Sequence, residues 1–358
     1  MYNFNPFISL ISKYRRVYKS LKYIKTNNIP EILLVFSRAG IGDALLLTGI
    51  AKEFALRGRQ GIAIVASNNA PHPELYYNND DISYVIDEDS YSPFVYSRKG
   101  INIIYANYHN LEDGHDDKFN PVNSHILEIM MAKSGITGTV SLRPYIYLTD
   151  EEKEYGKFSD KQITIQVSST SANVKKNNKE WYLSRFQYIV DKYQDKYQFI
   201  QIGMTNDDKL DNVIDLRGKT SLRQSASILN NSLIFIGLEG FLMHLARAVD
   251  TRSVIILGGR TRPQDTGYIC NENLYTQLPC APCFRWNTCE RERNKECMDL
   301  ISVEMVMSAI DKQLEKYNVP LEVESVIIPN DWIQKNYEYM KIGFPKYINP
   351  QLSDRIKK

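Results

Sequence analysis

The segment 232–259 places an acid and an imidazole where a phosphate would bind. An apolar stretch ends in a turn with Glu239 and Gly240, and the apolar helix expected next carries His244 near its start. A helix that begins directly after a strand leaves backbone N–H groups unpaired at the positive end of its dipole. We therefore expect a nucleotide or sugar diphosphate here. Glu239 needs a helix N-terminus or a ligand hydroxyl as partner, whereas His244 is equally compatible with a buried core imidazole.

A second turn of this kind holds Gly40, Gly42 and Asp43, between the first apolar strand and an apolar helix. Leu45 stands where a dinucleotide-binding fingerprint has its third glycine, which argues against a nicotinamide site. Asp43 then has two interpretations. It is either a helix cap, for which aspartate is well suited, or a general base at the floor of a cleft.

Four cysteines are compressed into one loop, Cys280, Cys283, Cys289 and Cys297, with the spacing C-x2-C-x5-C-x7-C. Thiolates this close in sequence suit a tetrahedral zinc or an iron with a structural role. Disulfides are the weaker alternative for a cytoplasmic chain. The fifth cysteine, Cys270, is interpreted as an ordinary thiol.

The first 30 residues are basic and amphipathic. They carry six lysines and arginines and no acid, with apolar side chains recurring at helical spacing. Two interpretations stay open. The segment is an interfacial helix that docks on anionic lipid, or it packs on its own domain or on a second subunit.

Composition narrows the class of protein. With 358 residues and 43% hydrophobic content the chain can form two cores of ordinary size. A net charge of +2 gives no reason to expect a nucleic-acid partner. We find neither an apolar run long enough to cross a bilayer nor a secretory signal, so we expect a cytoplasmic protein, with contact to the inner face of the cytoplasmic membrane as an option.

Apolar periodicity predicts two successive α/β halves. Short β-branched runs typical of buried parallel strands occur at 32–36, 62–67, 82–87 and 101–106, and again at 163–168, 199–203 and 213–216. A strand is also expected at 144–148, before a charged interdomain crossing. Helical patterns separate most of these runs, which predicts doubly wound parallel sheets with a cleft between them.

The predicted division follows from these patterns. It comprises an N-terminal segment (1–30), a Rossmann-like domain (31–155), a second one that includes the cysteine loop (156–318), and a helical tail returning to the first domain (319–358).

Several motifs, in this order, resemble glycosyltransferase family 9, the heptosyltransferase-like enzymes. The similar motifs are G-x-G-D-x-L-L-x-T from Gly40 to Thr48, K-x-W at Lys179, G-K-T-S-L from Gly218, G-x-E-G-x-x-x-H-L-A from Gly237, and the cysteine-rich tail. Together they extend over roughly residues 31–315. The resemblance implies a GT-B fold, with acceptor bound by the first domain and nucleotide sugar by the second.

The resemblance also implies roles for single residues. Asp43 would deprotonate the acceptor hydroxyl, Lys179 would steady the diphosphate, and Glu239, Gly240 and His244 would line the donor pocket. Ser168 and Ser169 would face the phosphates, and Thr220 would lie near the base. Family members commonly have Asp, then Ser or Thr, then Gly where this chain has Glu239, Gly240 and Phe241, so the donor need not be ADP-heptose.

The function expected is an inverting glycosyltransferase that needs no metal for transfer, because a lysine and a helix N-terminus can stabilise the leaving diphosphate. The donor would be a nucleotide-diphospho-sugar, with an ADP-linked one expected first, and the sugar transferred would be heptose or a related sugar. The acceptor would be a glycan or a lipid-linked sugar that becomes part of a bacterial surface glycan such as lipopolysaccharide or O-antigen. The alternatives are a GT-B nucleotide-sugar 2-epimerase and a non-catalytic binding or scaffold protein.

Overall fold

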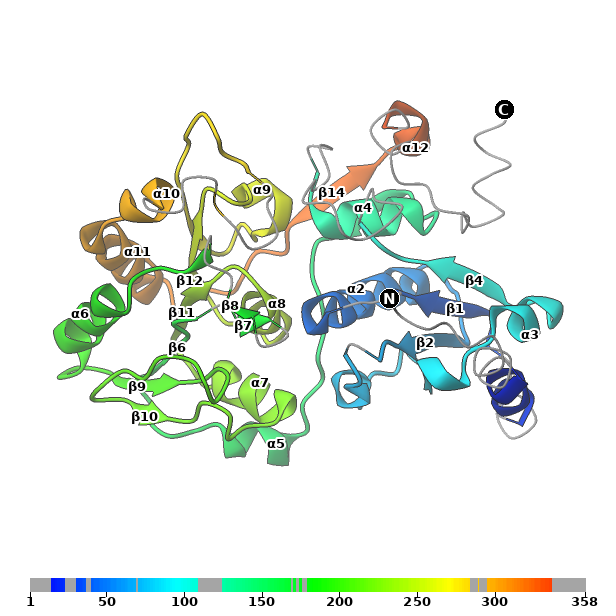
Figure 1. The fold of residues 1–358 in the computed structure, drawn as a ribbon, viewed down its shortest axis with the longest axis horizontal. Coiled ribbons are helices and arrows are strands. Elements are labelled where there is room, and N and C mark those ends of the chain that lie inside the picture. The colour runs from blue at the N-terminus through cyan, green and yellow to red at the C-terminus, as the bar shows by residue number, and fades with distance from the viewer. Residues whose placement is uncertain are drawn as a thin grey trace, which may run out of the picture.

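The computed structural model consists of two α/β lobes, each built on a parallel sheet (Figure 1). It describes residues 14–22, 30–36, 40–68, 70–108, 124–168, 170–171, 174–175, 179–283, 289 and 295–336. The predicted fold class, GT-B with two Rossmann-like lobes, is confirmed by this arrangement and by the likenesses reported below.

The N-terminal lobe has a four-stranded parallel sheet in the order β3-β2-β1-β4. Its strands are β1 (Ile32–Val35), β2 (Ile62–Ala66), β3 (Tyr84–Asp87) and β4 (Asn102–Tyr105), and its helices are α2 (Ile41–Leu56), η1 (Pro73–Tyr76), η2 (Glu88–Ser90), α3 (Pro93–Arg98) and α4 (Ile126–Lys133). Ile32 and Leu34 face one buried cluster, while Leu33 and Val35 face another. Because both faces are covered, the strands are continuously apolar, as the sequence indicated.

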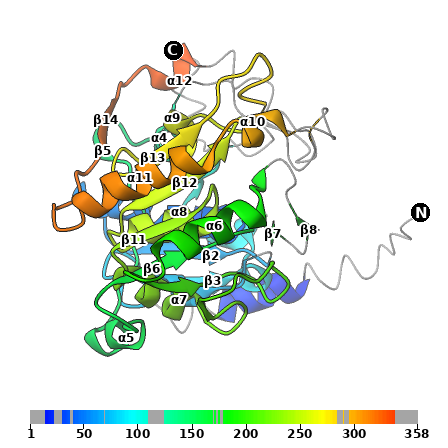
Figure 2. The same ribbon diagram turned by 90° about the vertical axis from the view of Figure 1, so that its left-hand side faces the viewer.

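The C-terminal lobe has a six-stranded parallel sheet in the order β10-β9-β6-β11-β12-β13. Its strands are β6 (Gln162–Ile165), β9 (Gln198–Gln201), β10 (Ile214–Asp215), β11 (Ile234–Leu238), β12 (Ser253–Gly258) and β13 (Glu272–Tyr275), beside a small antiparallel pair, β7 (Thr170–Ser171) and β8 (Val174–Lys175). Its helices are α6 (Leu183–Tyr193), α7 (Leu222–Asn230), α8 (Phe241–Ala248), α9 (Pro263–Thr266), α10 (Glu296–Asp299) and α11 (Val303–Glu315). Helices α6 and α11 cover the outer face of the sheet (Figure 2).

Two segments connect the lobes. The charged crossing contains a short helix, α5 (Asp150–Tyr155), with a capping box between Thr149 and Glu152. The strand expected at 144–148 is wrong, because no ladder forms there. The first regular element after α11 is a strand, β14 (Ser325–Ile328), paired antiparallel with β5 (Gly138–Ser141).

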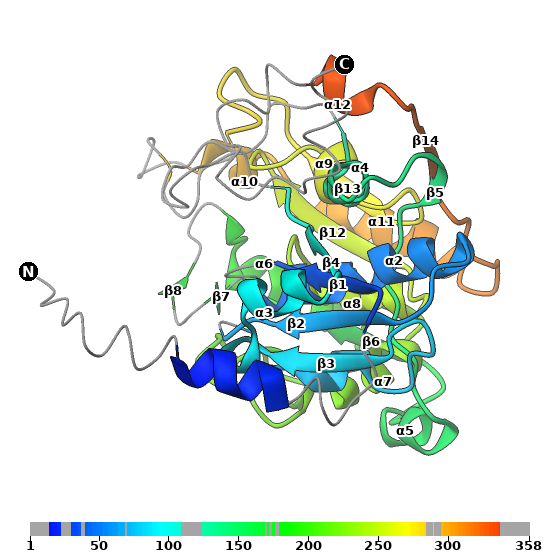
Figure 3. The same cartoon turned by 90° about the vertical axis from the view of Figure 1, so that its right-hand side faces the viewer.

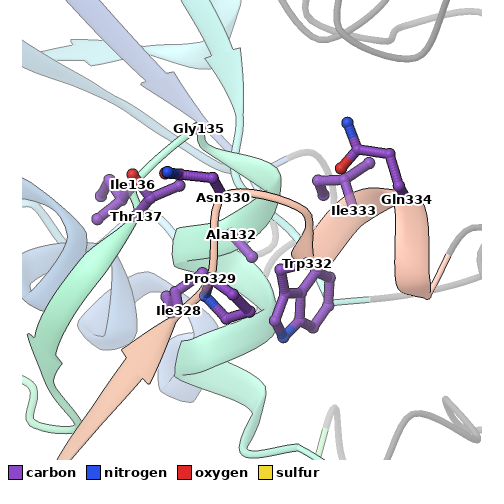
Figure 4. A pocket seen from close by; sticks show the side chains of 10 residues that line it. All are labelled: Ala132, Gly135, Ile136, Thr137, Ile328, Pro329, Asn330, Trp332, Ile333 and Gln334. Carbon is purple, nitrogen blue, oxygen red and sulfur yellow. The ribbon is translucent and has the colours of Figure 1, made fainter. Parts of the chain in front are cut away.

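The short helix α12 (Trp332–Lys335) anchors the returning tail on α4. Trp332 Nε1 donates a hydrogen bond to Glu128 Oε1 at 2.9 Å. A small pocket lies at this seam, lined by side chains of α4, β14 and α12, and it contains none of the predicted site residues (Figure 4). Within the described part of the chain, every helix is too short or too polar to span a bilayer.

The two lobes share one hydrophobic core. A single cluster of buried side chains includes Leu45 of α2 and Met243 of α8. A Cβ atom built on Gly49 of α2 would lie 2.5 Å from the carbonyl oxygen of Arg143, so the helix packs directly on backbone there. The lobes are thus held in one arrangement by ordinary apolar packing.

Arg223 of α7 adds a buried polar link between the lobes. Its guanidinium pairs with Glu152 and donates to the carbonyl oxygens of Tyr147 at 2.6 Å and Glu74 at 3.0 Å. The arginine is 7% exposed. Its pairing explains why the pKa of Glu152 is lowered to about 2.

Replacing Arg223 with Met should lower the free energy of unfolding by about 2 kcal/mol, because a partly buried carboxylate and two carbonyls lose their donor. Urea denaturation measures this loss. The matched control is Lys153→Met, which removes the exposed pair with Asp150 (2.9 Å) and should lower the free energy of unfolding far less, because water screens exposed ion pairs. Equal losses for the two variants would contradict the proposed link.

Candidate functional site

Asp43 lies in the first turn of α2 with both carboxylate oxygens engaged. Oδ2 accepts a hydrogen bond from the backbone N–H of Gly40 at 2.8 Å, which is the capping interaction that the sequence allowed. Oδ1 accepts one from the hydroxyl of Tyr108 at 2.8 Å. Among the described residues no lysine, arginine or histidine forms an ion pair with Asp43. In the described part of the chain, the carboxylate is therefore oriented by two neutral donors.

Tyr108 follows β4 and connects Asp43 to the opposite lobe. Burial raises the pKa of its hydroxyl, and the negative charges of Asp43 and Glu239 raise it further while Arg260 opposes them. The hydroxyl consequently remains a proton donor towards Asp43. Its ring packs edge-on against Phe36, with centroids 5.7 Å apart. That Glu239 and Arg260 act on this hydroxyl places groups of both lobes around one site.

The first turns of α2 and α8 meet at this site. A Cβ atom on Gly42 would lie 3.7 Å from Phe241 Cα and 3.7 Å from His244 Cδ2. Gly240, which precedes α8, has φ +154°, a conformation that side chains disfavour. The N-terminal turns of two helices therefore lie close together, and their dipoles favour an anion near this point.

Glu239 holds two cations of the C-terminal lobe. It forms an ion pair with Lys179, and Arg260 Nη1 lies 3.5 Å from the same carboxylate oxygen. Burial alone would raise the pKa of Glu239, but the charges of Lys179 and Arg260 outweigh it and hold the pKa at about 2. The predicted residues Lys179 and Glu239 thus come together, beside an arginine that the sequence did not point to.

His244 is buried and neutral. Its Nδ1 lies 2.6 Å from the hydroxyl of Tyr268, and burial lowers its pKa to about 4. His125, at the start of α4, packs on the other side of Tyr268 with ring centroids 5.4 Å apart. Burial and the neighbouring His244 lower the pKa of His125 to about 3. The core-imidazole interpretation of His244 describes this geometry, although its Cδ2 also faces the start of α2.

The remaining residues predicted to contact the donor are Ser168, Ser169 and Thr220. Ser168 is buried, and its hydroxyl donates to both oxygens of Glu180 at 3.1 Å, so it is already engaged. Thr220 lies in the turn after β10, with its hydroxyl 2.8 Å from that of Ser225. Ser169 lies outside the described residues.

All five cysteines are free thiols. Burial raises the pKa of Cys297, and Cys280, Cys283 and Cys289 all raise it further, so each of these three sulfurs lies within electrostatic reach of Cys297. In the described part of the chain, no three acidic, cysteine or histidine side chains are arranged to hold a metal. A tetrahedral ion would require the thiols to draw closer than they are here.

Sequence reasoning missed Tyr108, Arg260, His125 and Tyr268. Tyr108 and Arg260 follow the carboxyl ends of β4 and β12, which is where ligands of doubly wound sheets bind, so strand position was an available signal. His125 and Tyr268 meet only through the packing of the two lobes. No local sequence pattern predicts that contact.

The chain and its fold are similar to known glycosyltransferases. Residues 143–293 match the model of glycosyltransferase family 9 (heptosyltransferase). The fold is similar to a family 9 glycosyl transferase from Veillonella parvula, with a TM-score of 0.59, 15% identity, and 81% of this chain and 99% of that one covered. No curated protein sequence gives a significant match.

Two further similar structures come from E. coli. The iron-containing dodecameric glycosyltransferase TibC has a TM-score of 0.61, 18% identity, and 80% of this chain and 77% of that one covered. ADP-heptose lps heptosyltransferase II has a TM-score of 0.57, 14% identity, and coverage of 80% and 99%. TibC has also been solved in complex with ADP-D-β-D-heptose.

The two facing parallel-sheet lobes and these likenesses define the fold class as GT-B. More narrowly, residues 143–293, which include Lys179, Glu239 and His244, match the model of glycosyltransferase family 9, so the resemblance seen in the motifs is confirmed over this part of the chain.

The buried imidazoles predict acid sensitivity. Both histidines have pKa values lowered from 6.5, to about 4 for His244 and about 3 for His125, so the unfolded chain takes up protons that the folded chain does not. Stability should be complete above pH 6.5 and fall as the pH drops towards 4. Each histidine contributes up to about 1.4 kcal/mol per pH unit, so the free energy of unfolding should fall by about 2 kcal/mol between pH 6 and pH 5.

Urea denaturation at the two pH values measures this change. His125→Gln and His244→Gln should each remove about half of the loss, whatever they do to stability at pH 7. His72→Gln, at an imidazole that is 31% exposed, is the matched control and should leave the loss intact. The low pKa of Glu239 lies below this window. Equal stability at both pH values would contradict the proposal that the two imidazoles are buried uncharged.

Proposed function

We propose that the protein is an inverting glycosyltransferase that moves heptose or a related sugar from a nucleotide-diphospho-sugar to a bacterial surface glycan. The observation that carries the proposal is the meeting of Asp43 with the Lys179–Glu239–Arg260 cluster around Tyr108, between two helix N-termini. This arrangement supplies a carboxylate on one side and a positive, largely buried anion site on the other. Those are the two groups that direct displacement at an anomeric carbon needs.

The proposed reaction is a single displacement. Asp43 takes the proton of the acceptor hydroxyl while the acceptor oxygen attacks the anomeric carbon from the face opposite the diphosphate. The bond from the anomeric carbon to the diphosphate oxygen breaks, its electron pair leaves with the nucleoside diphosphate, and the configuration inverts. Tyr108 would hold the carboxylate in position, because its hydroxyl donates to Oδ1 and leaves the second lone pair of that oxygen for the incoming proton.

Stabilisation of the leaving group is assigned to the C-terminal lobe. The N-terminus of α8 offers backbone N–H groups, and Lys179 and Arg260 offer fixed positive charge. Lys179, Arg260 and Glu239 together carry a net charge of +1. The cluster therefore attracts an anion even while the carboxylate of Glu239 is paired. Cations and helix dipoles of this kind can serve the transfer step without a metal ion, which is the mechanism we propose.

We propose an ADP-linked donor, with Thr220 near the base. TibC was crystallised with ADP-D-β-D-heptose, and its fold is similar over 80% of this chain. The sugar itself is left broader than heptose because Glu239 and Phe241 replace the smaller residues expected from the family pattern. The proposed acceptor is a glycan or lipid-linked sugar at the inner face of the cytoplasmic membrane.

Replacing Asp43 with Asn should abolish transfer, with a loss of about 10²–10⁴-fold in kcat, because a general base contributes that much. Asparagine keeps a side-chain oxygen that can accept the hydrogen bond from the Gly40 N–H, so the fold should be kept. Transfer from ADP-, GDP-, UDP- and CDP-linked sugars to a lipopolysaccharide-derived acceptor is measured, together with thermal stabilisation by the free nucleotides. ADP should stabilise the wild type and the variant alike.

The matched control is Asp150→Asn, an acid in the first turn of α5 that pairs with exposed Lys153. It should transfer at the wild-type rate. Unchanged turnover in Asp43→Asn would remove its assignment as base. Incubation of wild type with donor but no acceptor separates the alternatives: a 2-epimerase would yield an epimer, whereas a binding or scaffold protein would bind nucleotide without transfer under any condition.

We also propose that Cys280, Cys283, Cys289 and Cys297 bind a structural zinc or iron. Support comes from their mutual proximity around Cys297 and from the description of TibC as iron-containing. The ion would cross-link the loop to the end of β12, where the backbone N–H of Cys283 donates to Gly259 at 3.1 Å. It would take no part in transfer.

Protein purified without chelators should contain about one zinc or iron per chain by elemental analysis. Cys280→Ser should lose the metal and lower thermal stability, because metal binding to the folded state adds to its stability. The control Cys270→Ser changes the buried thiol outside the cluster and should retain the metal. Metal-free wild-type protein with unchanged stability after metal addition would rule the site out.

A further inference from the structure

Residues 14–22 form a helix whose apolar stripe is left exposed. The exposed fractions are 70% for Tyr14, 69% for Tyr18 and 42% for Leu21, which recur at helical spacing. The inward contact is made instead by Ser20, which is fully buried and donates from Oγ to the carbonyl oxygen of Ser90 at 2.6 Å. The alternative in which this apolar face packs on its own lobe is therefore not what the described residues show.

Basic side chains flank the exposed aromatic residues. Two residues along a helix are about 200° apart, so Tyr18 points away from the side that carries Ser20. Arg15, Lys19 and Lys22 lie around Tyr18 on this outward half, and the helix contains no acid. Arg16 lies nearer the inward side, 3.9 Å from Asp89. The outward surface, Tyr14, Arg15, Tyr18, Lys19, Leu21 and Lys22, is here called the basic aromatic face.

The helix lies at the edge of the sheet that carries the proposed base. It contacts η2, which follows the carboxyl end of β3, and Asp43 follows the carboxyl end of β1. Strands β1, β2 and β3 are parallel neighbours, so these ends lie at the same edge, about 10 Å apart across two strand spacings. Figure 3 shows the helix, in dark blue, beside β3.

We propose that the basic aromatic face docks the protein on an anionic lipid surface. Tyrosine rings with cations around them match a membrane interface, where the rings enter the headgroup region and the cations meet lipid phosphates. Contact with a second copy fits the charges less well, because two such faces would bring cations of the same sign together. This inference rests on the proposed function, since docking at this edge would present a lipid-linked acceptor on the side of Asp43.

The neighbouring element has the same chemistry. Helix α3 follows η2 almost directly, and its Phe94 is 57% exposed. Arg98 lies over the Phe94 ring, 4.3 Å from its centroid. Aromatic and cationic side chains thus continue beyond the first helix on the elements that follow β3.

Co-sedimentation of the full chain with vesicles tests the proposal without donor or acceptor. Wild type should bind vesicles of phosphatidylglycerol mixed with phosphatidylcholine, bind phosphatidylcholine alone weakly, and lose binding as salt is raised. The charge reversal Arg15→Glu with Lys19→Glu should weaken binding to the anionic vesicles at least ~25-fold, because each lost cation is worth roughly fivefold. The double variant Tyr14→Ser with Tyr18→Ser should weaken vesicle binding at low and at high salt alike.

The matched control lies on α6 of the other lobe, where Lys192 sits over the ring of Tyr188, itself 45% exposed. Tyr188→Ser with Lys192→Glu removes the same residue types and should leave vesicle binding unchanged. Stabilisation by ADP should be equal in all variants, which confirms that they are folded.

Three results would overturn the proposal: no binding of wild type to anionic vesicles, equal loss in the α6 control, or a dimer in sedimentation velocity that the Arg15 and Lys19 reversals dissociate. Because vesicle binding is measured without transfer, its failure is distinct from failure of the proposed function, which the Asp43 variant tests.

Discussion

The close packing of α2 on α8 is the contact on which the rest of the site depends. A Cβ atom on Gly42 would already be in ordinary van der Waals contact with Phe241 and His244 at 3.7 Å, so the two helices lie close together at this point. The contact brings the first turns of both helices together and carries the apolar core from one lobe to the other. Asp43 and Glu239 approach each other only because of this packing. The site is therefore a product of the lobe interface, and neither lobe contains it alone.

The electrostatics of that interface follow from its burial. Charged groups removed from water must be paired, and the structure pairs Glu239 with Lys179 and Arg260. The imidazoles, which can lose their charge, are instead neutral, as their lowered pKa values show. Tyr108 stays protonated for the same reason. Among the residues that the structure describes at this site, the paired charges of Lys179, Glu239 and Arg260 belong to the C-terminal lobe, whereas Asp43 of the N-terminal lobe is half-buried and accepts hydrogen bonds from neutral donors.

The sequence predicted the parallel strands well because strands covered on both faces must be continuously apolar, as Leu33 and Leu34 illustrate. It failed at 144–148 because apolar alternation there serves a different purpose: Tyr145 N–H donates to Thr48 Oγ1 at 2.8 Å, and the segment packs along α2 without a ladder. The pairing of β14 with β5 joins residues almost two hundred positions apart, which no local pattern encodes. For the site, the motifs indicated Asp43, Lys179 and Glu239, whereas the contacts of Tyr108 and Arg260 depend on how the lobes meet.

The two cations paired with Glu239 explain why a glutamate suits this position. Lys179 and Arg260 are both largely buried. Leaving their two charges unpaired there would cost more free energy than the surrounding packing contributes. A glutamate, one methylene longer than the aspartate of the family pattern, has the reach to engage both from the turn before α8. Under the function proposed above, an entering diphosphate would take over as their partner, and the carboxylate would then be free to accept hydrogen bonds from sugar hydroxyls. In that proposal Glu239 would hold Lys179 and Arg260 in place before the donor binds, and it would contact the sugar afterwards. The departure from the family pattern at position 239 would then affect which donor is bound.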